Sequence, residues 1–158
     1  MPEPARVAGR KADGGVFTIR AAVADDVPAV ARLDETNTGL AKPDYWRQVF
    51  ARYGARRNRF FLVAEADGRL DGFIVGEVRA WEFGSPPCGW IIALGVDPER
   101  RLRKVGSRLF EAMCGRLRRC GVTTVRTMLA RDDALNMAFF RAQGMWGGPF
   151  IQLEKPLE

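Results

Sequence analysis

The residue pattern best suited to chemistry in this sequence is a basic segment with one glycine, Arg101-Leu102-Arg103-Lys104-Val105-Gly106-Ser107. It follows the apolar run Trp90–Val96 and opens a stretch with helical periodicity. A strand that leads through a glycine-bearing turn into a helix presents free backbone N–H groups and the positive end of the helix dipole to an anion. Between Arg100 and Arg119 there are eight Lys or Arg residues and one acidic residue, which adds positive charge. The segment therefore predicts an anion-binding site.

Several other catalytic arrangements are excluded by residue type. The chain has no histidine, which removes Ser-His-Asp and Cys-His mechanisms and the commonest metal ligand. The three cysteines, Cys88, Cys114 and Cys120, are not spaced as a CxxC pair, so no metal site is expected. Their sparse, odd number argues against a disulfide framework and favours a reducing compartment, so we expect a cytoplasmic protein. Neither a GxGxxG fingerprint nor a Walker A loop is present.

Length and charge fit one globular domain with an anionic partner. The chain has 158 residues, 47% of them hydrophobic and 28% charged, and its net charge is +6. That balance favours a nucleic acid, a phosphorylated cofactor or an acidic protein surface. The chain lacks the aromatic motifs of RNA-binding modules, so no nucleic acid is expected, and no apolar run is long enough for a membrane. We interpret residues 1–15, which have no signal-like apolar segment, as a mobile tail and residues 16–158 as a single domain.

Hydrophobic periodicity predicts the elements that position the basic segment. Alternating or continuous apolar runs indicate strands, and apolar residues three and four apart indicate helices. Strands are expected at 16–20, 59–65, 73–83, 90–96, 123–130 and 146–153, and helices after Asp25 or Asp26, from Pro43, over 105–120 and between Asp133 and Gly144. Asp67-Gly68 predicts a turn, Asp71-Gly72 a second break or a bulge, and Ser85-Pro86-Pro87 a reversal. The order β-α-α-β-β-β-α-β-α-β is that of an α/β layered fold.

Two segments of the chain resemble motifs of a known family. Residues 96–109, VDPERRLRKVGSRL, resemble the acetyl-CoA-binding motif (Q/R)xxGx(G/A) of the GNAT N-acetyltransferases, with Arg101 and Gly106 matching. Residues 133–145 resemble that family's last-helix signature, NxxAxxxYxxxGF. The order of elements is also similar, and the resemblance covers about residues 16–153. It implies a single acetyltransferase domain, with a mixed, mostly antiparallel central sheet flanked by helices, that transfers an acetyl group from acetyl-CoA to a primary amine.

The resemblance also implies where acetyl-CoA binds. The pantetheine arm is expected to pair with the backbone of residues 94–96 like an added strand, and an N–H near Leu94 to polarise the thioester carbonyl. The predicted cofactor-binding residues are Leu94, Gly95, Val96, Arg101, Arg103, Lys104, Val105, Gly106, Ser107, Asp133, Asn136 and Phe140. Lys104 replaces the first glycine of the motif: its Cβ could obstruct the pyrophosphate, or its charge could attract it. We expect binding to be retained with altered geometry.

The proton-transfer groups that the family often uses are missing here. The strand glutamate corresponds to Ile92 and the tyrosine of the last helix to Phe140. An amine with a pKa of about 10.4 must lose a proton before it attacks, and without histidine the base must be a carboxylate, directly or through water. If the hairpin is centred near the two prolines, Ile92 lies opposite residue 80 and Glu82 is its diagonal neighbour, whereas a one-residue shift selects Glu77. Glu82 and Glu77 are the predicted catalytic residues. The structural alternatives are an ion pair of Glu77 with Arg79 and an exposed strand end at Glu82.

The amine acceptor is indicated only by a few surface features. Residues 35–42, expected to form a loop, are predicted to shape its groove together with the helix over 43–53 and the strand over 73–83. Acidic residues that could attract the amine, and tryptophans that could flank it, are Asp34, Glu35, Asp44, Trp81 and Trp90. A protein lysine or N-terminal amine is the leading prediction, ahead of a small amine or an antibiotic. A non-catalytic acyl-CoA sensor is the alternative of another class, and the oligomeric state stays open, a homodimer included.

Overall fold

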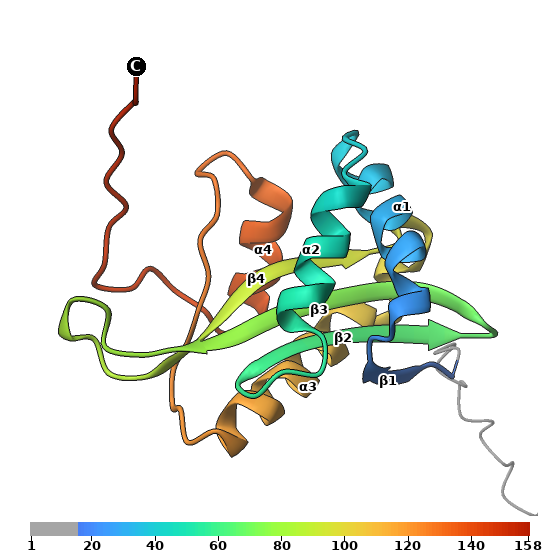
Figure 1. Ribbon diagram of the computed structural model, residues 1–158, viewed down its shortest axis with the longest axis horizontal. Helices are drawn as coiled ribbons and strands as arrows, with labels where there is room; N and C mark the ends of the chain where they lie inside the picture. The colour runs from blue at the N-terminus through green and yellow to red at the C-terminus, as the bar shows by residue number, and fades with distance from the viewer. Residues whose placement is uncertain (1–15) are drawn as a thin grey trace, which may run out of the picture. The chain divides into compact units, whose positions relative to one another are not determined.

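The computed structural model describes residues 16–158 and contains a five-stranded sheet with helices on both faces (Figure 1). The predicted tail, residues 1–15, lies outside the described residues. The chain divides into two compact units, one ending at Thr127 and the other running from Met128 to Glu158. The first unit contains β1 (Thr18–Ala21), η1 (Ala24–Asp26), α1 (Val27–Thr38), α2 (Pro43–Tyr53), β2 (Arg59–Ala66), β3 (Arg69–Arg79), η2 (Glu82–Gly84), β4 (Cys88–Val96), η3 (Pro98–Arg103), α3 (Val105–Arg119) and β5 (Val125–Arg126). The second unit contains α4 (Ala134–Ala142).

The sheet has its strands in chain order, β1-β2-β3-β4-β5. The first three pairings are antiparallel and β4 pairs with β5 in parallel, which confirms the mixed, mostly antiparallel sheet. Asp67 and Gly68 join β2 to β3 with φ angles of 51° and 71°, the positive values that a tight hairpin turn requires. Ala64 pairs with Gly72 whereas Glu65 pairs with Leu70, so Asp71 is the extra residue of a β-bulge, as predicted.

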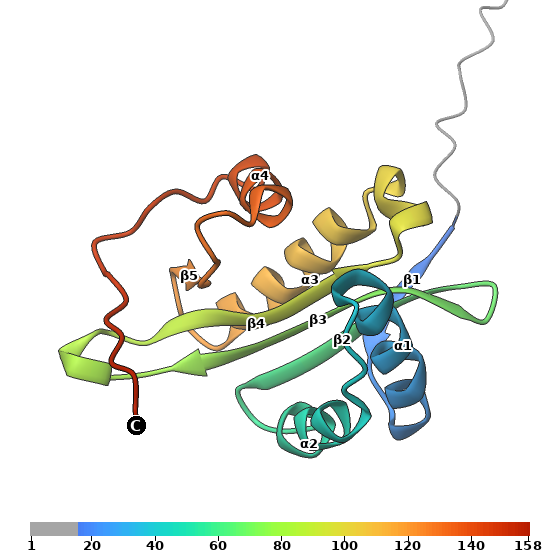
Figure 2. The ribbon, with the colours of Figure 1, turned by 90° about the horizontal axis from the view of Figure 1, so that it is seen from above.

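The two faces of the sheet are covered by different helices (Figure 2). The α1/α2 face carries an apolar cluster that includes Trp46, Phe61 and Phe73. On the α3 face, a Cβ added to Gly72, Gly76 or Gly89 would lie 2.9, 2.9 or 2.5 Å from a side chain of α3. Glycine at these positions of β3 and β4 therefore allows α3 to pack closely on the sheet.

Several element boundaries differ from the predictions, and those of the strands differ because they depend on long-range pairing. The predicted loop over 35–42 is shortened, since α1 continues to Thr38 and Gly39 ends it with a φ of 74°. The strand predicted to reach residue 83 ends at Arg79, and the strand predicted over 123–130 is reduced to Val125–Arg126. No strand forms at 146–153, where Gly147-Gly148-Pro149 interrupts the β-forming residues and no described strand pairs with them. Within residues 16–158, none of the helices has the length and apolar character needed to cross a bilayer.

Candidate functional site

The predicted anion site is the turn between β4 and α3, residues 97–104 (the anion turn). Asp97 begins the turn, and its Oδ1 accepts a hydrogen bond from the backbone N–H of Glu99 at 2.9 Å. Lys104 then adopts φ 60° and ψ 22°, and its side chain makes no capping hydrogen bond to α3. The N–H of Arg108 donates to the carbonyl of Lys104 at 3.1 Å, so helical hydrogen bonding begins at that residue. The first N–H groups of an α-helix point out from its N-terminal end, which is the end where an anion is expected here.

The conformation of Lys104 shows what the replacement of the motif's first glycine costs. A positive φ is the backbone region that favours glycine, and a residue with a Cβ adopts it at a cost of roughly 1–2 kcal/mol. The first glycine of the motif therefore corresponds to the position where this turn needs a left-handed residue. Lys104 meets that need with strain, and its exposed side chain lies in the same turn as the exposed side chains of Arg101 and Arg103.

Beside this turn, β4 has an open edge. It pairs with β5 only through Gly89 and Trp90, after which the Thr127 hydroxyl donates to the carbonyl of Ile91 at 3.0 Å. No described strand pairs with residues 92–96 on this side. Because the N–H of the following residue, Asp97, donates to β3, and alternate residues of a strand face opposite edges, the N–H groups of Leu94 and Val96 face the open edge. This orientation is the one that the predicted pairing with pantetheine needs.

Gly95, another predicted cofactor-binding residue, has a packing reason to be glycine. It pairs with Phe73 across the sheet, and a Cβ on Gly95 would lie 2.4 Å from the Phe73 ring. The absence of a side chain at this position is therefore explained by the core.

The predicted placement of Glu82 is wrong. Arg79 pairs with Cys88, so the strands separate at a different point from the one assumed for a hairpin centred on the prolines. Glu82 lies beyond β3 in η2, where its side chain is 58% exposed and 3.9 Å from the guanidinium of Arg79. It lies beyond the paired residues of β3 and β4, so it is not a cross-strand neighbour of Ile92.

The predicted pairing of Ile92 with residue 80 is also wrong, because β3 ends at Arg79 and its register places Ile92 near Val75 and Gly76, at a bulge of β4. Val75 pairs with Ala93 and Gly76 with Ile91, which leaves Ile92 as the extra residue. Sequence reasoning assumed a regular ladder and so missed this irregularity. The bulge lies two residues before Leu94, the residue whose N–H faces the open edge.

Glu77 is the predicted catalytic residue that the structure places beside this part of β4. It pairs with Trp90 and is mostly buried. Its Oε1 accepts from Nε of Arg79 at 2.9 Å, so the ion pair considered as the structural alternative is present, and its Oε2 is 3.6 Å from Nε of Arg59. The Arg79 guanidinium lies 4.5 Å from the centroid of the Trp90 ring. Burial raises the pKa of Tyr53 and the negative charge of Glu77 raises it further, which indicates that these two groups are neighbours.

The acidic residues predicted to attract the acceptor are largely engaged in other contacts. Asp34 is buried, accepts from the Trp46 indole N–H at 2.9 Å and pairs with Lys42 at 2.9 Å. Asp44 forms an ion pair with Arg47 on the surface of α2. Trp81, predicted to flank the acceptor, is exposed at the tip of the β3–β4 connection.

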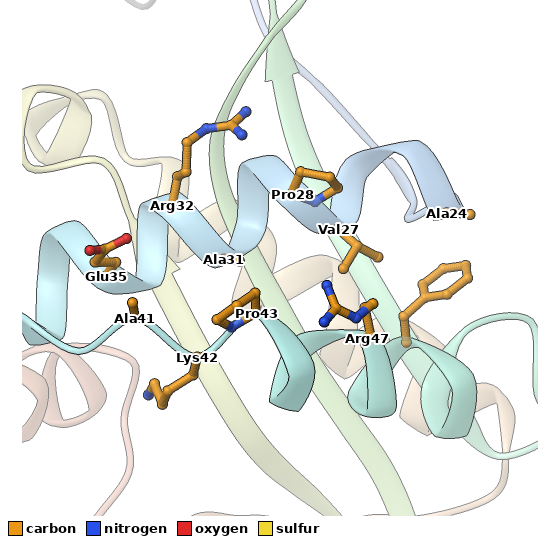
Figure 3. A pocket seen from close by; sticks show the side chains of 11 residues that line it. Ala24, Val27, Pro28, Ala31, Arg32, Glu35, Ala41, Lys42, Pro43 and Arg47 are labelled. Atoms are coloured by element: carbon orange, nitrogen blue, oxygen red, sulfur yellow. The ribbon is translucent and has the colours of Figure 1, made fainter.

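A groove of about 490 Å³ lies between α1 and α2 (Figure 3). Its apolar lining includes Val27, Ala31, Pro43 and Phe50, and the charged residues around it are Arg32, Glu35, Lys42 and Arg47. It shares parts of α1 and α2 with the predicted acceptor groove, but no residue of β4 or of the anion turn lines it. The groove is therefore separate from the place where acetyl transfer is predicted.

The second unit contains the remaining predicted cofactor residues. Asp133 caps α4 at the start of the predicted helix: its Oδ1 accepts from the backbone N–H of Asn136 at 3.1 Å and its Oδ2 from the side-chain amide of Asn136 at 2.8 Å. Phe140 is buried and lies edge-to-face with Phe139, with ring centroids 5.1 Å apart. Contact of Asp133, Asn136 and Phe140 with the cofactor stays a prediction.

The cysteines are not arranged as nucleophiles. All three are free thiols. Cys88 is buried and its Sγ accepts from the Arg126 guanidinium at 3.3 Å. Burial raises the pKa of Cys114, which favours the unreactive thiol form. These environments are those of structural cysteines.

Sequence reasoning missed Asn37, which connects α1 to the end of β4 and to η3. Its side-chain amide donates to the carbonyl of Val96 at 3.2 Å, and its Oδ1 accepts from Arg101 at 3.0 Å. The signal that could have found it is Gly39, because a glycine C-cap there places Asn37 in the last turn of a helix rather than in a loop.

Comparisons with known proteins find sequence similarity to acetyltransferases. The mycothiol acetyltransferase of Sanguibacter keddieii is 30% identical over 131 residues, which are 82% of this chain and 39% of that protein. The L-2,4-diaminobutyric acid acetyltransferase of Nocardia farcinica is 33% identical over 81 residues, 51% of this chain and 40% of that protein. The chain thus spans about two-fifths of the length of these curated relatives.

Among solved structures, the aminoglycoside N-acetyltransferase AAC(6')-Iy in complex with CoA is similar, with a TM-score of 0.78 and 15% identity, covering 92% of this chain and 98% of that one. At this identity the likeness shows the fold, and it confirms the predicted α/β architecture. The family model described as acetyltransferase (GNAT) family matches residues 27–145, which is most of the chain. The chain therefore belongs to the GNAT acetyltransferase family.

Proposed function

We propose that the protein is an N-acetyltransferase that moves an acetyl group from acetyl-CoA to the primary amine of a small molecule. The observation that carries the proposal is that the open edge of β4 leads, through a turn with exposed basic side chains, directly into the N-terminus of α3. The relatives named above support a small acceptor, because their names refer to diaminobutyric acid, mycothiol and aminoglycosides. That class was the alternative in the sequence analysis, and none of these names supports the leading prediction of a protein lysine.

The residues present fit acetyl-CoA, which would supply an acetyl group activated as a thioester. Its diphosphate would lie against the first N–H groups of α3, with Arg101, Arg103 and Lys104 adding positive charge. Its pantetheine arm would pair with the open edge of β4. The N–H of Leu94 would donate to the thioester carbonyl and stabilise the negative charge that develops on its oxygen.

The chemistry that follows is direct attack by the acceptor amine. The amine nitrogen forms a bond to the carbonyl carbon, the C–S bond breaks, the amine loses a proton, and the departing thiolate takes a proton from water. We assign the relay of the amine proton through water to Glu77, because it is the predicted carboxylate that lies opposite β4. Orientation of the two substrates supplies much of the rate.

An acceptor screen that follows free coenzyme A tests this function. The panel contains small diamines, an amino acid with a side-chain amine, an aminoglycoside and a lysine peptide, each with acetyl-CoA. We expect thiol release above background with at least one small amine and none with the peptide. Release with the peptide alone would show a protein acceptor, and cofactor binding without release for any amine would show an acyl-CoA sensor.

A further inference from the structure

Asp71 is a buried carboxylate for which the proposed reaction has no use. It is the extra residue of the β3 bulge, and its side chain is 2% exposed. Its Oδ1 is 3.7 Å from Nε of Arg100 and 3.6 Å from Nε of Arg69. Among the described residues, neither Oδ1 of Asp71 nor Nε of Arg100 has a hydrogen-bond partner. A buried carboxylate and a partly buried guanidinium are therefore held close together without forming a tight ion pair.

The bulge is connected directly to the start of the anion turn. The carbonyl of Asp71 accepts from the N–H of Asp97 at 2.8 Å. The carbonyl of Asp97 accepts from the N–H of Arg100 at 2.8 Å, and its carboxylate accepts from Arg69 at 3.0 Å. The contacts made by Asp71 thus join β3 to the first residues of η3, the segment that leads to Lys104.

The energetics of such a pair favour a role other than stabilisation. Burial of two charges costs several kcal/mol per ion, and the attraction offsets this only when the geometry is good and the remaining atoms are hydrogen-bonded. Here the contact is long and two polar atoms lack partners. Replacement of such a pair by apolar residues is often neutral or stabilising. Fold stability therefore does not explain why Asp71 and Arg100 occupy this position.

The position of Arg100 suggests what the pair does. Arg100 lies in η3, and Lys104 follows at the end of η3 in a left-handed conformation that a lysine adopts with strain. A strained conformation persists only where the surrounding structure holds it. The guanidinium of Arg100 is directed at the buried Asp71, whereas the side chains of Arg101 and Arg103 are exposed. Arg100 is thus placed to anchor the turn, and its neighbours are placed to meet an anion.

We propose that Asp71 and Arg100 are positioning residues, which hold η3 and the N-terminus of α3 in the shape that receives the diphosphate of acetyl-CoA. They act through the backbone of the turn and do not touch the ligand. The inference rests on the proposed function, because it requires that the turn bind the cofactor.

The first test uses the full chain with Asp71→Asn and, separately, Arg100→Gln. We expect each variant to raise the KM for acetyl-CoA and to weaken the binding of coenzyme A about tenfold, equivalent to about 1.4 kcal/mol. The kcat at saturating acetyl-CoA stays within about twofold of the wild-type value, because the reacting groups are intact. The matched control is Arg118→Gln, which removes the same charge from the exposed, opposite end of α3 and leaves KM unchanged.

A double variant separates positioning from folding. Asp71→Leu with Arg100→Met removes both charges together, so its melting temperature is expected to equal or exceed that of the wild type. Its affinity for coenzyme A is still expected to fall about tenfold, because the anchor is gone. Wild-type affinity in this double variant, or an unchanged KM in Asp71→Asn, would overturn the inference and leave the proposed function standing. If the wild-type chain itself does not bind coenzyme A, the proposed function fails, and the inference fails with it.

Discussion

Lys104 shows how one backbone angle affects both stability and ligand binding. The turn before α3 needs a residue with positive φ, and lysine meets this need at a cost that glycine would avoid. The same residue carries a positive charge at the end of the helix where an anion is expected. Lysine in place of the motif's first glycine therefore introduces backbone strain and adds a positive charge at the proposed diphosphate site.

Two substitutions at Lys104 separate these effects. Lys104→Gly and Lys104→Ala remove the same charge, but only glycine also removes the strain. We expect the glycine variant to be more stable than the alanine variant by about 1 kcal/mol in the free energy of unfolding, measured by chemical denaturation. Both variants should bind coenzyme A, with equal, reduced affinity. Complete loss of binding in both would show that the lysine is itself an essential phosphate ligand.

Replacement of Glu77 and replacement of Glu82 are expected to affect proton transfer differently. Glu77→Gln is expected to lower kcat/KM roughly tenfold to a thousandfold at neutral pH, within the usual range for lost general-base catalysis. The loss should shrink as pH rises, because more of the acceptor amine is already deprotonated. Glu82→Gln is the control, since its side chain is exposed beyond the end of β3, and it should retain the wild-type rate. Both are measured as pH–rate profiles from about pH 6 to 9 with one acceptor. Wild-type profiles for both variants would remove the carboxylate from the mechanism.

At the scale of the element, β4 joins the core to the predicted active site. One bulge places Ile92 outside the regular ladder with β3, and the next residues leave their backbone open on the side of β5. Glycines at Gly89 and Gly95 face the core from opposite sides of the strand, against α3 and against Phe73. Close packing of its two faces holds the strand in place, while its unpaired edge leaves the backbone open to a ligand.

Gly95→Ala tests this packing. The added Cβ would lie 2.4 Å from the Phe73 ring, so we expect a loss of about 1–3 kcal/mol in the free energy of unfolding. Combining it with Phe73→Leu should recover part of the loss, which a double-mutant cycle would measure as a favourable coupling. Gly115→Ala is the control, because a Cβ there meets no atom within 4 Å, and it should stabilise α3. Equal effects of Gly95→Ala with and without Phe73→Leu would contradict the packing explanation.

At the scale of the whole molecule, one arginine links the first strand to the rest of the first unit. Arg20 donates to both oxygens of Asp26 at 2.7 and 2.9 Å and to Glu65 at 2.7 Å, which connects β1, η1 and β2. The guanidinium of Arg20 holds the pKa of Asp26 below its usual value, and a hydrogen bond from the N–H of Val23 acts in the same direction against the effect of burial. This contact should make the stability of the fold sensitive to acid.

The sign of that sensitivity follows from the lowered pKa of Asp26. The contribution of Asp26 is fully present above the ordinary carboxyl pKa of about 4, and it is lost as pH falls through the lowered value of the folded state. Asp26→Asn should therefore destabilise the protein by about 2 kcal/mol at neutral pH and by progressively less in acid. Thermal unfolding from neutral pH to about pH 3 measures the difference. The neighbouring exposed Asp25→Asn should show little effect, and a pH-independent loss in Asp26→Asn would exclude the ionic explanation.

The local parts of the site could be predicted from the sequence. The basic turn, the Asp67-Gly68 hairpin turn, the Asp133 cap and the order of elements as far as α4 depend on residues close together in the chain, and their residue types restrict the backbone directly. Two of these segments, the basic turn and the last helix, carried the resemblance to the GNAT family together with the order of elements.

Other features were decided by the tertiary structure, because they depend on which distant residues pair. The register of β3 with β4 moved Glu82 out of the site and left Glu77 opposite Trp90. A bulge at Ile92 and the shortness of β5 depend on how strands separate, which no local pattern specifies. The contacts of Asn37 with Val96 and of Asp71 with Arg100 join segments far apart in the chain. The local sequence therefore determined the helices, most of the strands and the basic turn. The pairing of the strands and the contacts of Glu77, Asn37 and Asp71 were determined only by the tertiary structure, because they join distant parts of the chain.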